Sequence, residues 1–347
     1  MKHTQNQLLT LLVLTFITII PTYGQTVAES KRIWDKTPHC AFTDLLYYKN
    51  AFYCCFREGN SHVPYRWADD GKIRVLKSKD GEEWQSFALL ELPGIDLRDP
   101  KISVTPDGRL MLTMGGSVYM MGEFKGSRTH VAFFDKKTGS FSKPIPIELS
   151  AELYTGMDWL WKVTWHKKNA YGLIYQVDKE TGSNILLLVS SKDGIHYQLV
   201  SRIPISKHLP NEGAIRFDKN NNMKFIVRCE DGEVGGFYGE SAYPYTDWKV
   251  YDVGKQLGGP DMITVPDGKT IVATRAFGDK GPYTALMELG KNYKLQEICR
   301  FPSGGDCSYP GLVYKDGYLY VSYYSGHNRG HAIYFSKIDY SQLFPKQ

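Results

Sequence analysis

Several side chains that can carry acid–base chemistry stand at the edges of short apolar segments. A pair of carboxylates such as Asp99 with Glu212 or Asp261 could hydrolyse a glycosidic bond, because one protonates the leaving oxygen while the other acts as base or nucleophile. Neighbouring charges and partial burial can move the pKa values of two such groups apart. His62 is another candidate acid or base, for hydrolysis or for elimination from a uronic acid.

Such groups act together only if the fold brings them to one place. In a propeller, the starts of the innermost strands and the ends of the second strands meet at one mouth of the central channel. The residues that we expect to meet there are His39, Asp44, Arg57, Glu58, His62, Arg98, Asp99, Trp159, Glu212, Arg228, Asp261, Arg275, Asp306, Tyr309 and His327. Trp159 and Trp161 offer an aromatic platform for a sugar ring, and Trp161 also fits the apolar core.

The elements that must position these side chains form an internal repeat. Six segments each show a polar or Gly/Pro-rich start, an apolar strand, a tight polar turn and a second apolar strand. The spacing of roughly 50 to 60 residues suits four-stranded blades. The turns are rich in Asn, Asp and Gly, as in residues 106–108 (PDG) and 266–268 (PDG), which tolerate the positive φ of hairpins.

The repeat predicts an all-β fold, a six-bladed β-propeller of four-stranded antiparallel blades spanning residues 25–347. The last repeat lacks an outer strand, and residues 31–37 could supply it and close the ring. A seven-bladed ring with one degenerate blade and a pair of stacked sandwiches are the alternatives.

The first 24 residues are typical of a secretory signal peptide. A charged start is followed by an apolar run over residues 8–20 and by small residues up to Gln25. The run is short for a bilayer span, and no positively charged stop-transfer flank follows it. We therefore expect cleavage near Gln25, export to the periplasm or beyond, and no integral membrane span in the mature chain.

The charge, the cysteine content and the absence of certain motifs limit the partners and cofactors that we expect for this protein. The formal net charge of +5 comes without a Lys/Arg block, so we expect no nucleic-acid partner. The six cysteines and nine histidines show no zinc-binding spacing, and no nucleotide-binding motif occurs, so we expect no metal and no cofactor. One disulfide, Cys299–Cys307 or Cys40–Cys54, and buried free thiols are equally compatible with an oxidising compartment.

Two outer hairpins carry a shared motif, at residues 78–84 (SKDGEEW) and 191–197 (SKDGIHY). They resemble the Asp-box, or BNR repeat, of bacterial sialidases, although here the Gly directly follows the Asp. The Asp can cap its own turn while the aromatic residue packs against the blade. The box lies on the blade periphery in that family, so this resemblance implies the propeller and not the chemistry.

The chain also resembles the sialidase-like superfamily at the inner strand ends. In that family a Tyr near the start of the sixth blade is the nucleophile and a Glu near the start of the fourth is its base. The resemblance places Tyr309 and Glu212 in these roles, and implies that Arg57, Arg228 and Arg275 clamp an acidic sugar. A phenol has a pKa of about 10, so its attack needs a neighbouring carboxylate.

Two positions of that family pattern carry other residues. Phe42 stands where the family has its first arginine, and His62 stands near the place of its acid Asp. The chain is therefore more similar to the sialidase-like proteins that polysaccharide-degrading bacteria export, many of them labelled exo-α-sialidase, than to a sialidase proper.

These observations predict an exported glycoside hydrolase that acts on a terminal, acidic or deoxy sugar of an oligosaccharide or glycoconjugate. The candidate catalytic residues are Tyr309, Glu212, Asp99 and His62, and the candidate substrate-binding residues are Arg57, Arg228, Arg275, Arg98, Asp44, Asp261, Asp306, His327 and Trp159. One alternative is a polysaccharide lyase or rhamnosidase-like propeller that uses a histidine. Others are a non-catalytic carbohydrate-binding propeller and a protein-binding propeller, which would show a large apolar patch at its mouth.

Overall fold

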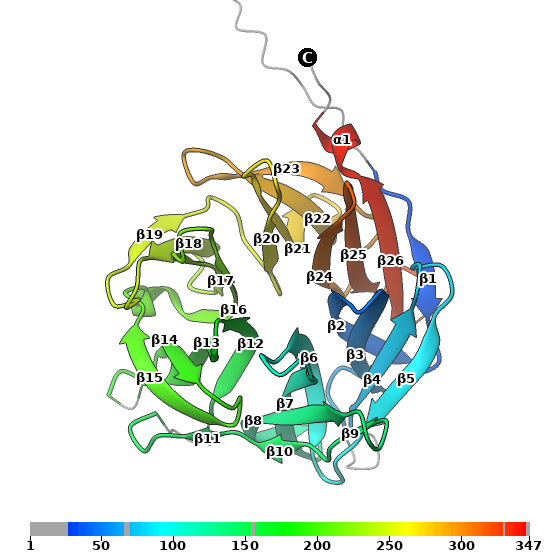
Figure 1. Cartoon of the computed structure of the whole chain (residues 1–347), viewed down its shortest axis with the longest axis horizontal. Coiled ribbons are helices and arrows are strands. Elements are labelled where there is room, and N and C mark those ends of the chain that lie inside the picture. The colour runs from blue at the N-terminus through cyan, green and yellow to red at the C-terminus, as the bar shows by residue number, and fades with distance from the viewer. Residues whose placement is uncertain (1–26, 66–69, 154–156, 179, 329, 345–347) are drawn as a thin grey trace, which may run out of the picture.

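Strands that follow one another in the sequence pair into six antiparallel sheets, which stand around a central axis (Figure 1). The computed structural model describes residues 27–65, 70–153, 157–178, 180–328 and 330–344. Six sheets in a ring confirm the predicted six-bladed propeller against the seven-bladed and sandwich alternatives. The predicted signal peptide, residues 1–24, lies outside the described residues. Within the described part of the chain, no helix has the length and apolarity that a bilayer crossing requires.

Each blade runs outward from the axis in chain order. The innermost strands are β2 (His39–Tyr48), β6 (Asp96–Val104), β12 (Trp159–His166), β16 (Pro210–Phe217), β20 (Asp261–Thr264) and β24 (Cys307–Lys315). The second strands are β3 (Ala51–Gly59), β7 (Leu110–Met120), β13 (Asn169–Val177), β17 (Met223–Cys229), β21 (Thr270–Gly278) and β25 (Tyr318–Ser325). The third strands are β4 (Lys72–Ser78), β8 (Glu123–Asp135), β14 (Asn184–Ser191), β18 (Gly236–Ser241), β22 (Gly281–Leu289) and β26 (Ala332–Asp339).

The outer strands are less regular than the prediction of four strands per blade. They are β5 (Gln85–Leu90), β9 (Ser140–Phe141) with β10 (Ile145–Pro146), β15 (His196–Arg202), β19 (Lys249–Asp252), β23 (Leu295–Arg300) and β1 (Lys31–Trp34). The second blade has its outer strand split in two, because Pro144 and Pro146 have no N–H to donate to a ladder. In the third blade, β11 (Glu148–Leu149) adds a fifth strand parallel to β15.

The ring closes by pairing the two ends of the propeller in one blade. Strand β1 lies antiparallel to β26, with Lys31 opposite Phe335 and Arg32 opposite Tyr334. This confirms that residues just after the predicted signal supply the missing outer strand of the sixth blade. A short helix, α1 (Tyr340–Leu343), follows β26.

Apolar side chains between adjacent blades form the core. Among the described residues, six buried clusters occur, one at each interface between neighbouring blades. At the interface of the first and second blades, for example, Ile73 and Leu112 are both inaccessible to solvent. Because a blade buries both of its faces only when it has two neighbours, closure of the ring completes the core.

All six cysteines are free and buried. Neither of the two alternative disulfides, Cys299–Cys307 or Cys40–Cys54, is formed, and the alternative of buried free thiols is confirmed. Burial raises the pKa of Cys54 to about 12, so its thiol stays protonated and behaves as a small apolar group.

Five of the six innermost strands have an irregularity near their starts. Register shifts fall at Ala41/Asp44, Arg98/Lys101, Leu160/Val163, Pro210/Gly213 and Ser308/Gly311. A bulge of this kind bends its strand and changes the direction of a side chain. Phe42, Asp99 and Tyr309 lie within three of these bulges and have φ of 62°, 49° and 47°. A left-handed conformation costs a non-glycine residue about 1–2 kcal/mol, so the backbone is strained at three residues of the site described next.

Candidate active site

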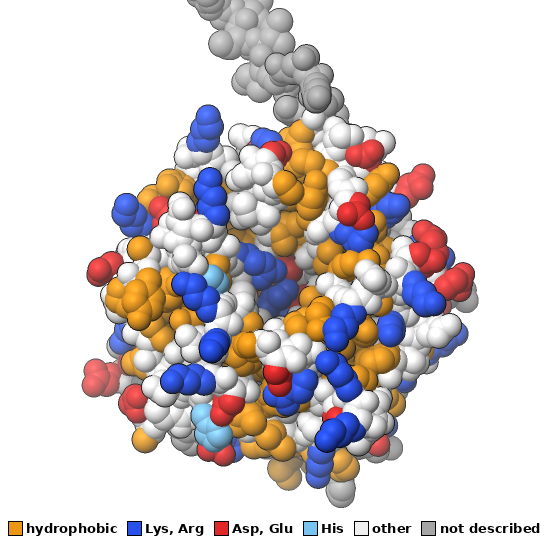
Figure 2. All heavy atoms as spheres, in the orientation of Figure 1, with side chains coloured by type: hydrophobic (Ala, Val, Ile, Leu, Met, Phe, Trp, Pro, Cys, Tyr) orange, Lys and Arg blue, Asp and Glu red, His pale blue; other side chains and the backbone are white. Residues whose placement is uncertain are grey.

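The centre of the wheel is hollowed on the face that Figure 2 shows, and basic and acidic side chains lie in the hollow. Charged side chains from innermost and second strands of different blades form three groups: a central cluster around Tyr309, a histidine cluster around Asp306 and a buried ion-pair network around Lys162. Each is described in turn.

Tyr309 and Glu212 form the centre of the site. The Tyr309 hydroxyl donates a short hydrogen bond to Glu212 Oε1. Arg228 Nη1 donates to the same oxygen at 3.0 Å and lies 3.4 Å from the Tyr309 hydroxyl. The Gly259 N–H holds the other oxygen, Oε2, at 2.6 Å. The carboxylate is therefore fixed in a position to take the phenolic proton.

The electrostatics of this pair keep the phenol neutral at rest. Burial and the charge of Glu212 raise the pKa of Tyr309 well above its usual value, against a lowering effect of Arg228 and Arg275. The Arg275 guanidinium lies 5.2 Å from the centre of the Tyr309 ring. It is held there by the Cys307 carbonyl, at 2.9 Å from Nε and 2.7 Å from Nη2. Two of the three predicted arginines, Arg228 and Arg275, thus flank the candidate nucleophile.

Arg57 lies away from the open site. Its side chain is fully buried and forms a 2.6 Å ion pair with Asp96, which is also fully buried. Arg57 Nη1 donates to the Ser61 carbonyl at 2.9 Å, so the arginine supports the segment that carries His62. The geometry therefore gives no support to the predicted substrate contact of Arg57. Glu58, its neighbour, turns to the other face of the strand and pairs with Arg74.

Asp99 and Arg98 line the site from the second blade. The Asp99 side chain is buried, and its Oδ1 has no hydrogen-bond partner among the described residues. Arg98 Nε lies 3.5 Å from Asp99 Oδ2, while Arg98 Nη1 donates to Tyr119 at 2.8 Å. Burial raises the pKa of Asp99 to about 6, against the lowering effect of Arg98. The Arg98 guanidinium also lies 5.1 Å from the centre of the Phe42 ring.

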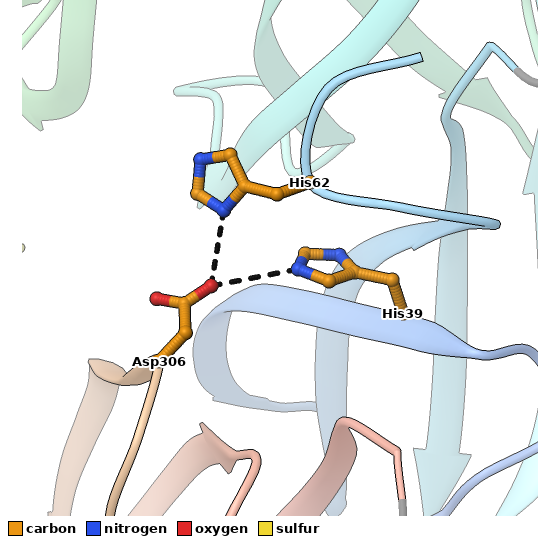
Figure 3. A group of neighbouring side chains, drawn as sticks. All are labelled: His39, His62 and Asp306. Atoms are coloured by element: carbon orange, nitrogen blue, oxygen red, sulfur yellow. Dashed lines mark hydrogen bonds and ion pairs between the residues drawn. The ribbon is translucent and has the colours of Figure 1, made fainter. Parts of the chain in front are cut away.

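The two carboxylate oxygens of Asp306 have different neighbours: Oδ2 faces histidines, and Oδ1 faces Tyr324 and Arg275. Its Oδ2 lies 3.0 Å from His62 Nδ1 and 3.5 Å from His39 Nε2 (Figure 3). Its Oδ1 accepts the Tyr324 hydroxyl at 2.6 Å and Arg275 Nη2 at 3.1 Å. Burial alone would raise the pKa of Asp306, but the hydrogen bonds from His39, His62 and Tyr324 hold it well below its usual range. Asp306 is therefore an ionised acceptor.

Asp44 and Asp261 lie deep in the channel and not at its mouth. Lys162 Nζ bridges them, at 2.7 Å from Asp44 Oδ1 and 2.8 Å from Asp261 Oδ2. Arg216 Nη2 pairs with Asp261 Oδ1 at 2.7 Å, and the Ile102 N–H donates to Asp44 Oδ2 at 2.9 Å. Opposite charges thus occupy both predicted binding carboxylates, and Lys162 ties the first, third and fifth blades together.

Two further predicted binding residues differ in their surroundings. His327 Nδ1 lies 2.7 Å from Ser325 Oγ and its ring packs 5.1 Å from Tyr334, so its described contacts lead away from Tyr309. Trp159 is half-buried and stacks on Tyr175 at 6.4 Å with an interplanar angle of 12°. Burial raises the pKa of Tyr175, and the charges of Glu212 and Asp99 raise it further. Because those two carboxylates act on Tyr175, the Trp159–Tyr175 pair lies beside the central cluster.

Sequence analysis did not identify Tyr324, Tyr175 or Lys162 as site residues. The repeat does contain a signal for Tyr324. In the sixth blade Tyr324 pairs with Ser308 just before the register shift, and in the first blade Arg57 pairs with Ala41 at the equivalent place. Aligning the ends of the second strands would have found it. Lys162 shows no such signal, because a lysine in an apolar strand is as compatible with a solvent-facing position as with a buried one.

Two described groups have ligand atoms close enough together for a metal ion: His39 with His62 and Asp306, and His208 with Asp231 and Glu233. In the first, Arg57 Nη1 lies 3.4 Å from His39 Nδ1 and can only donate, which puts the histidine proton on Nε2, the nitrogen that would bind a metal. In the second, Asp231 bonds His208 and accepts the backbone N–H of Glu233, as a turn-forming residue does. Both groups thus have an assigned hydrogen-bonding role.

No protein-family model matches the chain, and no curated protein matches its sequence. Among solved structures it is similar to a Dyadobacter fermentans protein of unknown function, with a TM-score of 0.76 and 16% identity over 91% of this chain and 98% of that one. It is also similar to Trypanosoma rangeli sialidase in complex with the inhibitor DANA, with a TM-score of 0.69 and 14% identity over 91% of this chain and 61% of that one.

A third similar structure is the α-L-arabinofuranosidase of Fusarium graminearum in complex with an iminosugar inhibitor. The TM-score is 0.69 and the identity 13%, over 92% of this chain and 99% of that one. At such identities the likeness shows the shared propeller fold. It confirms the resemblance to sialidase-like propellers at the level of the fold.

Proposed function

We propose that the protein is a glycoside hydrolase that removes a terminal acidic sugar from an oligosaccharide or glycoconjugate. One observation carries the proposal: the Tyr309 hydroxyl donates to a Glu212 carboxylate that Arg228 and Gly259 hold in place. A buried phenol beside a fixed base and two arginines matches the need of covalent catalysis by a weak nucleophile.

The geometry supports a two-step reaction. Tyr309 attacks the anomeric carbon as Glu212 takes its proton, and the glycosidic bond breaks. The charge that develops on the phenolic oxygen lies next to Arg228 Nη1, 3.4 Å away. Water then attacks the glycosyl–tyrosine, and Glu212 returns the proton to Tyr309.

The charges around the pair favour an acidic sugar. An ionised nucleophile would be repelled by a carboxylate on the substrate, whereas a protonated phenol carries no charge until Glu212 removes the proton. Arg228 and Arg275 are partly exposed beside the phenol, and a guanidinium suits a carboxylate partner. That solved sialidase and arabinofuranosidase structures share the fold adds support from analogy alone.

Export and the Asp-box belong to the same proposal. The first 24 residues have the pattern of a signal peptide, which would place the enzyme in the periplasm or outside the cell. In the two hairpins with the shared motif, Asp80 Oδ1 accepts the Glu82 N–H and Asp193 Oδ1 accepts the Ile195 N–H, both at 2.8 Å. These self-capped turns support the likeness to the Asp-box of sialidases.

The test is a substrate screen with two variants. Purified protein is offered sialosides, rhamnosides and uronic-acid oligosaccharides, and product masses are measured. We expect product masses that sum to the substrate plus water, and Tyr309→Phe and Glu212→Gln should each lower turnover by about 10²-fold or more. The control is Tyr340→Phe, which removes a hydroxyl bonded to Asp267 and should leave turnover unchanged.

A fluorinated analogue of the accepted sugar tests the covalent step directly. The analogue slows the hydrolysis of a glycosyl–enzyme, so mass spectrometry should find the sugar on the peptide that contains Tyr309. Full turnover in both variants, or products that lack the elements of water, would refute the assignment.

A further inference from the structure

Three histidines surround one oxygen of Asp306, next to the Tyr309 cluster. Asp306 Oδ2 lies 3.0 Å from His62 Nδ1, 3.5 Å from His39 Nε2 and 4.0 Å from His331 Nε2. Figure 3 shows the His62 and His39 rings directed at this one oxygen from different segments, the first after β3 and the second at the start of β2. An aspartate surrounded in this way fixes the orientation and the proton positions of its neighbours.

The hydrogen-bond donors settle the tautomer of His39. Arg57 Nη1 lies 3.4 Å from His39 Nδ1, and a guanidinium only donates, so His39 Nδ1 accepts. The proton of the neutral ring is then on Nε2, which points to Asp306. Burial lowers the pKa of His39, which favours this neutral form. His39 therefore directs its Nε2 proton towards Asp306 Oδ2, 3.5 Å away, and Arg57 lies against its other ring nitrogen.

His62 turns its other ring nitrogen, Nδ1, towards Asp306. Asp306 is ionised and accepts, so His62 Nδ1 carries a proton and donates it. The His62 side chain is half-exposed, and its other nitrogen, Nε2, lies on the side of the ring away from Asp306 (Figure 3). The His62 ring stands edge-on to Phe42 at 5.3 Å, and the Tyr309 ring lies 5.1 Å from the same Phe42 ring. His62 and the candidate nucleophile thus contact one shared aromatic ring.

We propose that His62 Nε2 is the proton donor to the departing glycosidic oxygen, and that Asp306, His39 and Arg57 are its positioning residues. The inference rests on the proposed hydrolase function and adds to it the acid that the Tyr309–Glu212 pair lacks. In the first step, the bond from Tyr309 oxygen to the anomeric carbon forms as the glycosidic C–O bond breaks. The imidazolium form of His62, protonated on both ring nitrogens, gives its Nε2 proton to the leaving oxygen and becomes neutral, while Glu212 takes the proton of Tyr309.

The second step restores every group. Neutral His62 removes a proton from water as the water oxygen attacks the anomeric carbon, and the bond to Tyr309 breaks. Glu212 then returns its proton to the phenolic oxygen. The products are the free sugar and the shortened glycan, and both His62 and Tyr309 regain their protons.

Asp99 is the rival for the acid role. Its carboxyl is buried, whereas His62 is half-exposed, and the leaving part of a glycan extends from the open side of the site. The unpartnered Asp99 Oδ1 suits a hydroxyl of the bound sugar, which can donate to it. The titratable and charged groups around His62 are Asp306, His39, His331, Asp99, Arg98, Arg57 and Arg275.

Aryl glycosides of the sugar found in the screen separate these roles. A phenyl glycoside needs a proton on its leaving oxygen, whereas a dinitrophenyl glycoside does not. His62→Gln should therefore lose about 10²-fold or more in kcat/KM on the phenyl glycoside, and less than about 10-fold on the dinitrophenyl glycoside. The matched control, His196→Gln on an outer hairpin, where the histidine is exposed beside Asp193 and Glu148, should keep wild-type values on both substrates.

The same substrates test the positioning residues and the rival. Asp306→Asn should show the same selective loss as His62→Gln, to a smaller extent, because the ring of His62 remains but is held less well. Asp99→Asn should lose activity equally on both glycosides, as a binding residue does. If Asp99→Asn instead shows the selective loss and His62→Gln does not, the acid is Asp99 and the inference is wrong.

A measurement without substrate tests the geometry itself. In ¹⁵N-histidine NMR spectra, the neutral form of His62 should carry its proton on Nδ1 in the wild type. This proton position should change in Asp306→Asn. A proton on Nε2 of neutral His62 would overturn the inference. Displacement of the His39 and His62 signals by one equivalent of zinc would also overturn it, in favour of a metal site. The proposed function fails separately, when Tyr309→Phe keeps full turnover. The inference alone fails when Tyr309→Phe is inactive and His62→Gln loses equally on both glycosides.

Discussion

Replacing Asp99 by Asn should stabilise the propeller at neutral pH and have little effect in acid. The side chain is only 7% exposed, and burial is the largest cause that raises its pKa from 3.8 to about 6. Between these two pH values the native carboxyl keeps its proton while the unfolded one releases it. Unfolding then releases protons, so this group makes the wild type less stable as pH rises through the window, and the cost is constant above it.

The size of the effect follows from the shift. One pKa unit corresponds to about 1.4 kcal/mol, so a shift of about two units makes the buried charge cost about 3 kcal/mol at neutral pH. Asn has the same shape and no charge. The stability of Asp99→Asn relative to the wild type should therefore grow by about 2 to 3 kcal/mol between pH 4 and pH 7.5. Comparing two pH values cancels any constant difference in hydrogen bonding.

Urea unfolding at a series of pH values measures this difference. The control is Asp107→Asn at a surface turn, where a hydrogen bond from Thr105 lowers the carboxyl pKa. That group adds stability above its unfolded pKa and loses it as pH falls, so this variant should be less stable at neutral pH and approach the wild type in acid. A pH-independent difference for Asp99→Asn, or one with the same sign as that of Asp107→Asn, would refute the reasoning.

Three further changes test the interior of the wheel by urea midpoints. Lys162→Met leaves two buried carboxylates facing each other across the channel and should cost about 3–5 kcal/mol, and an unchanged midpoint would show that the bridge contributes nothing. Arg57→Met leaves its buried aspartate partner without a counter-charge and should cost a similar 3–5 kcal/mol, with a loss of less than about 1 kcal/mol counting against the pairing. Gly311→Ala would place a Cβ 2.1 Å from the Leu45 nitrogen and should prevent normal closure of the ring, seen as poor folding or a lower midpoint. The matched Gly304→Ala, whose Cβ would have its nearest neighbour at 3.7 Å, should behave as wild type.

The repeat in the sequence was enough to predict the ring and the meeting of distant residues. Alternation of apolar residues and the chemistry of turns are local properties, so they can be read without coordinates. The position of Tyr309 and Glu212 near the starts of innermost strands then predicted that they meet, since all such starts converge on one mouth of a propeller. The closing strand, β1 (Lys31–Trp34), was predicted for a similar reason, because the last repeat was one strand short.

Only the tertiary structure decided which charged side chains face the open site. Arg57 and Arg228 both end a second strand, yet the first is buried against Asp96 while the second holds Glu212. Asp44 and Asp261 were expected at the mouth and instead share Lys162 inside the channel. For Asp44 the physical reason is the bulge between Ala41 and Asp44 in its strand. Successive side chains of a strand point to opposite faces, so one inserted residue reverses the direction of those around it, and the sequence carries no local mark of that insertion.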